Sequence, residues 1–193
     1  MLVIGGIGMV GAFKILLTTL GPIPEAVAYL MLALVVICVV GLIDDLYHLS
    51  SKKLFAAQII AGLVVIWLGG TTVQNLGDLF GLGDVHTGPF KVLFTLICVL
   101  GVINAINMAD GLDGLAGFLV LIVSGWLAVL ACLSGQLVLF QMLLLLAGVV
   151  LGFLVFNMRS PWNKQATIFM GNAGSMSLGL LVTWFSVELS GKV

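Results

Sequence analysis

Two acidic residues close together in the sequence are the first candidates for chemistry. Asp110 and Asp113 lie in the stretch INAINMADGLDGLAG, residues 103–117, at the end of a long apolar run, and the chain has only eight Asp and Glu in 193 residues. Asn107 precedes Asp110 by three positions, and residues three apart on a helical turn share a face. Carboxylate oxygens are preferred ligands of Mg²⁺, which often completes its shell with substrate phosphates. This spacing, with a helix starting near residue 114 that presents its positive end, predicts a polar edge able to hold a metal ion and a diphosphate.

A second acidic pair, Asp44 and Asp45, follows another apolar run. Carboxylates gathered in one patch repel each other, so a cation should compensate them, and Lys52, Lys53 or a divalent metal ion are candidates. A simpler alternative stays open for each pair. Asp113 can cap the next helix, and the aspartate pair can merely end a membrane span.

The composition places these residues in a membrane protein. The chain is 62% hydrophobic and 8% charged, with a mean hydropathy of +1.31, whereas soluble domains are about 25% charged. The net charge of -1 gives no indication of a nucleic-acid partner. The three cysteines all lie inside apolar runs, which favours buried free thiols.

Seven segments are long and apolar enough to be membrane helices, which need about 20 mostly apolar residues. They are residues 2–20, 25–43, 54–70, 90–109, 115–133, 136–156 and 167–187. The sequence therefore predicts an all-α fold, a polytopic membrane protein with about seven transmembrane helices. Residues 1–193 are expected to form a single transmembrane domain.

The alternation of these spans puts both acidic pairs on one side of the membrane. The loops at 44–53, 110–114 and 157–166 share that side, and they carry four basic residues: Lys52, Lys53, Arg159 and Lys164. The positive-inside rule then assigns this side to the cytoplasm. The other acids, including Glu188, fall on the opposite side. Two acidic pairs that are distant in sequence are therefore expected to meet at the cytoplasmic membrane surface.

Three stretches together resemble one known family. GLIDDLYHLSSKKLFAAQ (41–58), INAINMADGLDGLAG (103–117) and IFMGNAGSMSLG (168–179) are similar, in this order and spacing, to motifs of the polyprenyl-phosphate N-acetylhexosamine-1-phosphate transferases, glycosyltransferase family 4. The family includes the bacterial undecaprenyl-phosphate GlcNAc-1-phosphate transferase and the phospho-MurNAc-pentapeptide translocase. The first stretch looks closer to the GlcNAc branch. Taken alone, the small residues of the third stretch simply suit close helix packing.

The resemblance implies a reaction, its partners and its place. A lipid phosphate would attack the β-phosphate of a UDP-sugar, UMP would leave, and a lipid-diphosphate sugar would form. The implied cofactor is Mg²⁺, with Mn²⁺ as an alternative, because phosphoryl transfer needs charge neutralised on the diphosphate. The partners would be a UDP-sugar and a polyprenyl phosphate lipid, with a homodimer as one expectation. The site would face the cytoplasm from the bacterial inner membrane.

The resemblance also implies catalytic and metal-binding roles. Asp44 and Asp45 match an aspartate pair, one of which would act as a base toward the lipid phosphate or steer it. Asp110 would lie near the metal and the diphosphate, with Asn107 beside it. The family usually has Asp where this chain has Asn172, a neutral oxygen ligand, so weaker metal binding is expected.

Five residues match substrate-binding positions of the family pattern. Lys52 would hold phosphate, Asn107 would belong to the site, and Asp113 would lie near the uridine. Asn157 matches a polar site residue. Phe169 would stack on uracil, which needs only a flat apolar face.

The family members have about ten or eleven spans, so the resemblance implies that this chain is partial, without the first span and the C-terminal spans. An inactive fragment or a structural membrane partner is therefore the alternative to an active transferase. A CDP-alcohol phosphatidyltransferase is disfavoured because no Arg follows the Asp-Gly pair in DGLDGLAGFLVL. A transporter with a midplane ion site is disfavoured because the aspartates lie at span ends.

Overall fold

The structure is a computed structural model that describes residues 25–78, 81, 83–158 and 165–192. Its elements are α2 (Glu25–Tyr47), α3 (Ser51–Leu63), η1 (Val64–Leu68), η2 (Gly88–Phe90), α4 (Lys91–Ala109), α5 (Leu115–Leu133), α6 (Leu137–Asn157) and α7 (Gly171–Ser190). The element η1 is a π-helical continuation of α3, and η2 is a single 3₁₀ turn that leads into α4. Among these residues there is no strand, only an isolated bridge between Asn75 and His86.

Five helices of the described part are long and apolar enough to cross a membrane. They are Glu25–Tyr47, Ser51–Leu68, Gly88–Ala109, Leu115–Leu133 and Leu137–Asn157. They agree with five of the segments expected from the sequence, so the all-α polytopic class is confirmed. The count of seven is not confirmed, because the segment 2–20 lies outside the described residues and α7, in place of 167–187, is not among the five.

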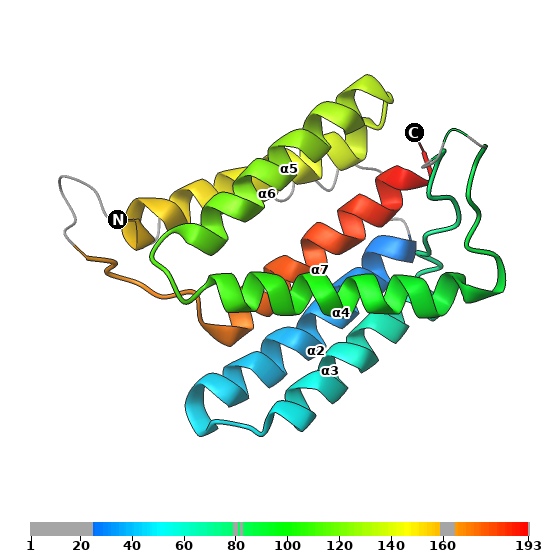
Figure 1. Cartoon of the computed structure of the whole chain (residues 1–193). Helices are drawn as coiled ribbons and strands as arrows, with labels where there is room; N and C mark the ends of the chain where they lie inside the picture. The colour runs from blue at the N-terminus through cyan, green and yellow to red at the C-terminus, as the bar shows by residue number, and fades with distance from the viewer. Residues whose placement is uncertain (1–24, 79–80, 82, 159–164, 193) are drawn as a thin grey trace.

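Helix α7 occupies the inside of the helix bundle. It packs against α2, α4 and α5, and Figure 1 shows it running between the α5–α6 pair and the helices α2 and α4. Half of its residues are buried, among them Met176, Leu180 and Phe185. Because α7 faces protein more than lipid, it can carry polar residues that a lipid-facing helix would not tolerate.

Glycines allow α7 to approach its neighbours at backbone distance. A Cβ on Gly41 of α2 would lie 2.5 Å from the Cα of Ala173, and a Cβ on Gly179 would lie 2.6 Å from the Cα of Ile103 on α4. Such close crossings by small residues are a common way to pack helices in a membrane. They confirm the packing role that the small residues of IFMGNAGSMSLG suggest.

The connections place three helix ends at the same end of the bundle. The C-termini of α2 and α4 lie near the N-terminus of α7, as Figure 1 shows and as the hydrogen bonds between α7 and each of these helices require. The acidic pairs of the sequence sit at these two C-termini. The fold therefore gathers the chemically interesting residues where the helices end and not at mid-span.

Candidate functional site

The N-terminus of α7 is the centre of the site. Asp45, at the end of α2, accepts hydrogen bonds from the backbone N–H groups of Asn172 at 2.8 Å and Ala173 at 3.2 Å. The first N–H groups of a helix have no partner within the helix, and the positive end of the helix dipole favours an anion there. Gly171 has φ +68°, and a Cβ on it would lie 2.7 Å from Oδ2 of Asp45. A glycine is therefore required where this carboxylate meets the helix.

The pKa of Asp110 is raised above its ordinary value. Burial of its carboxyl raises the pKa, a hydrogen bond from the backbone N–H of Gly171 lowers it, and the negative charge of Asp45 raises it again. The acid therefore shares the start of α7 with Asp45. A carboxylate held partly out of water beside another carboxylate is suited to bind a cation or a proton.

The predicted row of Asn107, Asp110 and Asp113 on one helical face is only partly correct. Helix α4 ends at Ala109 and Asp110 is its C-cap, so Asp113 lies in the turn that follows. Gly114, which ends this turn, has φ +82°, a conformation in which glycine avoids the strain of other residues. The helix terminus that meets the carboxylates of Asp45 and Asp110 is that of α7. That the helix beginning near residue 114 presents its positive end to a phosphate stays a prediction.

A chain of hydrogen bonds links Asp44 to α4 across α7. Asp44 is buried, and its Oδ2 accepts from Nδ2 of Asn172 while its Oδ1 accepts from the N–H of Leu49. Oδ1 of Asn172 accepts from Nδ2 of Asn107 at 2.6 Å. Asn107 also donates to Oγ of Ser175 at 2.8 Å, and that hydroxyl donates to the carbonyl of Gly171. Donors and acceptors are therefore matched along the whole chain.

Asn157 connects two loops at the edge of the site. Its Oδ1 accepts the N–H of Gly114 at 2.8 Å, and its Nδ2 donates to the carbonyl of Ile168 at 2.8 Å. The side chain is 4% exposed. Asn157 therefore holds the turn that contains Asp113 against the segment that contains Phe169. Direct contact of Asn157 with a substrate stays a prediction, and the structure adds this positioning role.

Two of the predicted substrate-binding residues are exposed. The side chain of Phe169 is 78% exposed, directly before Met170 and the start of α7. Lys52 lies exposed in the first turn of α3. Both lie in elements adjoining the acidic end of the bundle, where a ligand arriving from water can reach them.

The donor set fits a hard cation only if a ligand completes the coordination. In the described part of the chain, no three His, Cys, Asp or Glu side chains are grouped so that they could hold a metal ion. Asp45 and Asp110 each keep free lone pairs, and Oδ1 of Asn172 keeps one beside its bond from Asn107. Mg²⁺ commonly uses one or two carboxylates and takes its other ligands from water and substrate phosphates, and the residues present fit that mode.

Several contacts of the site could not be read from the sequence. The N–H groups of Gly171, Asn172 and Ala173 leave no signal in side-chain type, and Ser175 looked like one small packing residue among several. Asn104, within the stretch INAINMADGLDGLAG, donates to Oε1 of Gln58 at 2.7 Å, which ties α4 to α3 beneath the site. Only the tertiary contacts reveal these roles.

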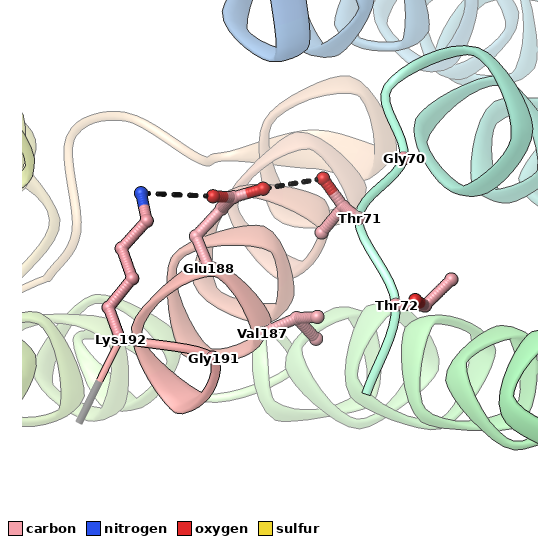
Figure 2. A pocket seen from close by; sticks show the side chains of 7 residues that line it. All are labelled: Gly70, Thr71, Thr72, Val187, Glu188, Gly191 and Lys192. Atoms are coloured by element: carbon pink, nitrogen blue, oxygen red, sulfur yellow. Dashed lines mark hydrogen bonds and ion pairs between the residues drawn. The ribbon is translucent and has the colours of Figure 1, made fainter. Parts of the chain in front are cut away.

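A separate polar group lies at the opposite end of α7. Glu188 accepts a hydrogen bond from the hydroxyl of Thr71 at 2.7 Å and pairs with Lys192 at 3.3 Å. Figure 2 shows the three side chains in line beside a pocket. These groups satisfy one another, and they join the C-terminal end of α7 to the segment after η1. Glu188 thus lies away from the acidic site, on the side that the sequence predicts.

Comparison with known proteins identifies related chains. A family model described as "Glycosyl transferase family 4" matches residues 27–190. The phospho-N-acetylmuramoyl-pentapeptide-transferase of Streptococcus thermophilus (strain ATCC BAA-250 / LMG 18311) is 32% identical over 87% of this chain and 50% of its own length. The undecaprenyl-phosphate alpha-N-acetylglucosaminyl 1-phosphate transferase of Yersinia pestis is 30% identical over 96% of this chain and 50% of its own. The protein of the same name from Escherichia coli (strain K12) is 32% identical over 86% and 45%.

The matched region spans about half the length of these curated relatives. Both kinds of relative match at nearly the same identity, so the comparison does not separate the two branches. All three polar stretches of the sequence fall inside the matched region, residues 27–190.

Proposed function

The chain belongs to glycosyl transferase family 4, and on that premise we propose that it transfers a hexosamine 1-phosphate, GlcNAc 1-phosphate in the first instance, from a UDP-sugar to undecaprenyl phosphate. The observation that carries this proposal is the meeting of Asp45 and Asp110, from two different helices, at the N-terminus of α7. Carboxylates, amide oxygens and helix N–H groups at a membrane surface are the parts that phosphoryl transfer between a lipid and a nucleotide sugar needs. The proposed product initiates cell-envelope polysaccharide synthesis.

The proposed reaction has a simple atom balance. An oxygen of the lipid phosphate attacks the β-phosphorus of the UDP-sugar, a new P–O bond forms, and the bond to the UMP oxygen breaks. Asp45 is exposed and Asp44 is buried, so Asp45 is the better placed of the pair to take a proton from, or steer, the lipid phosphate. Asp44 would act indirectly, through its hydrogen bond with the side chain of Asn172.

The proposed metal is Mg²⁺, with Mn²⁺ as an alternative. Asp110 would hold it together with the side-chain oxygens of Asn107 and Asn172, and it would neutralise charge on the diphosphate. Because Asn107 uses its amide nitrogen toward Asn172 and Ser175, its oxygen is the atom left for such a role.

The nucleotide is proposed to lie between the turn of Asp113 and the segment of Phe169, which Asn157 holds together. Asp113 would meet the uridine, and the exposed ring of Phe169 would stack on uracil. Lys52 would meet a phosphate. A site on the cytoplasmic face of a bacterial inner membrane is supported by Lys52 and Lys53, which are both exposed at the acidic end of the bundle.

The test is product formation from two labelled donors. The purified protein in detergent is incubated with undecaprenyl phosphate and Mg²⁺, and with either labelled UDP-GlcNAc or labelled UDP-MurNAc-pentapeptide. Label that enters the lipid fraction from UDP-GlcNAc, in step with UMP release, is the expected result. Label that enters the lipid fraction from UDP-MurNAc-pentapeptide alone would instead assign the protein to the phospho-MurNAc-pentapeptide branch of the family. No label from either donor would contradict independent transferase activity.

A further inference from the structure

The side chain of Asn172 joins three helices through one amide group. Its Nδ2 donates to Oδ2 of Asp44 on α2 at 2.5 Å, and its Oδ1 accepts from Nδ2 of Asn107 on α4 at 2.6 Å. Asn172 itself is the second residue of α7. Its nitrogen therefore has an acceptor as partner, on Asp44, and its oxygen has a donor as partner, on Asn107.

The chemistry of Asp44 fixes the orientation of this amide. An ionised carboxylate only accepts hydrogen bonds, so the nitrogen of Asn172 must face Asp44 and the oxygen must face Asn107. Asp44 is 7% exposed, and its other oxygen takes the N–H of Leu49 at 2.6 Å. Both oxygens of a buried carboxylate thus have donors, as burial of a charge demands. A carboxylate at position 172 would set an acceptor against an acceptor.

We propose that Asn172 is a positioning residue matched to Asp44. A carboxylate at position 172 destabilises the folded chain unless the charge of Asp44 is removed. The neutral Asn172, which is expected to weaken metal binding, is thus the residue that the hydrogen bonds at the start of α7 require. For the reaction, and resting on the proposed function, it means that Asp45 and Asp110 supply the negative charge facing the substrate, while position 172 supplies hydrogen bonds and one neutral oxygen for the proposed metal ion.

An exchange of the two residues tests the match. In the double variant Asp44→Asn with Asn172→Asp, the new amide at 44 donates to the carboxylate at 172 and still accepts the N–H of Leu49. The carboxylate at 172 still accepts from Asn107. Every hydrogen bond is restored and the net charge equals that of the wild type, with the charge moved from α2 to α7.

Asp45 offers a matched control. It accepts from the backbone N–H groups of Asn172 and Ala173, and no bond joins it to the side chain of Asn172 in the contacts above. The double variant Asp45→Asn with Asn172→Asp has the same net charge as the exchange variant. It removes a neighbouring charge without creating the donor that a carboxylate at 172 needs.

The measurement is thermal unfolding in detergent with EDTA, for the wild type, the three single variants Asn172→Asp, Asp44→Asn and Asp45→Asn, and the two double variants. We expect Asn172→Asp to lower Tm by about 5 °C or more. The Asp44 exchange should regain most of this loss, and its coupling should exceed that of the Asp45 control. For a variant that yields too little folded protein for a Tm, the monodisperse fraction on size exclusion gives the same ranking.

Two results would overturn the proposal. One is an Asn172→Asp variant that is as stable as the wild type without divalent metal. The other is an equal recovery of Tm in the Asp45 control, which would show that the effect depends only on net charge. Because unfolding is measured without substrate, the match can fail while the transferase proposal stands, and the reverse also holds.

Discussion

Asp110 shows how a site residue can reduce the stability of the fold that holds it. Burial and the charge of Asp45 together outweigh the N–H of Gly171 and raise the pKa of this carboxyl. Its ionised form is therefore less favourable in the folded protein than in the unfolded chain. We expect Asp110→Asn, which keeps an acceptor oxygen for Gly171 but carries no charge, to raise Tm near neutral pH in EDTA.

The sign of the pH dependence follows from this raised pKa. Between the unfolded and folded pKa values the folded protein binds more protons, so the contribution of Asp110 to stability falls as pH rises through that window. As pH falls through the same window, the wild type should gain stability relative to Asp110→Asn and the difference in Tm should shrink. Asp84→Asn, at an exposed site that accepts from Asn75, is the control. A constant difference at all pH values would contradict the assignment.

Asn157 is expected to act through the two loops that it holds. Asn157→Ala leaves the N–H of Gly114 without its acceptor and should cost about 1–3 kcal/mol of unfolding free energy. In the transfer assay the KM for the UDP-sugar should rise more than kcat falls, since the loops of Asp113 and Phe169 lose their register. Asn75→Ala, at a half-buried side chain away from the site that also accepts a backbone N–H, should change both constants little. Equal effects of the two variants on KM and kcat would contradict the positioning role of Asn157.

At the scale of elements, the start of α7 depends on a glycine. Gly171→Ala combines a φ of +68° with a Cβ only 2.7 Å from a carboxylate oxygen of Asp45, so Asp45 must leave its N–H partners or the helix must shift. We expect a loss of stability and activity together. Gly191→Ala, at the other end of the same helix, has φ -84° and nothing within 4 Å of its added Cβ. Unfolding curves that rank the two variants equally would contradict this account.

Which residues lie on which element could be predicted from the sequence only in part. Apolar length predicted α2, α4, α5 and α6 to within a few residues, because lipid imposes that length on any helix that spans it. The helical row from Asn107 to Asp113 was wrong beyond Asp110, because the turn at Gly111 and Gly114 ends the helix. The two hydrogen bonds of the Asn157 side chain to neighbouring loops depend on the backbone geometry at the C-terminus of α6. The length of an apolar segment does not reveal that geometry.

At the scale of the whole molecule, the side of each loop was enough to predict that distant acids meet. Alternation of spans put Asp44, Asp45 and Asp110 on one surface, and the structure brings them to one helix terminus. The alternation of spans does not predict the hydrogen-bond partner of each carboxylate, because that partner depends on how deeply α7 lies between α2 and α4. The midplane ion site of a transporter is also disfavoured, since these aspartates lie at helix ends.

The carboxylates at the start of α7 are proposed to carry phosphoryl transfer, and UMP release measures that transfer itself. Wild type, Asp110→Asn and Asp84→Asn are compared at equal concentrations of folded protein, with UDP-GlcNAc, undecaprenyl phosphate and Mg²⁺. We expect release that requires both the lipid and the metal, is unchanged in Asp84→Asn, and falls at least about 100-fold in Asp110→Asn. Release that is equal in Asp110→Asn, or absent from the wild type, would contradict this proposal.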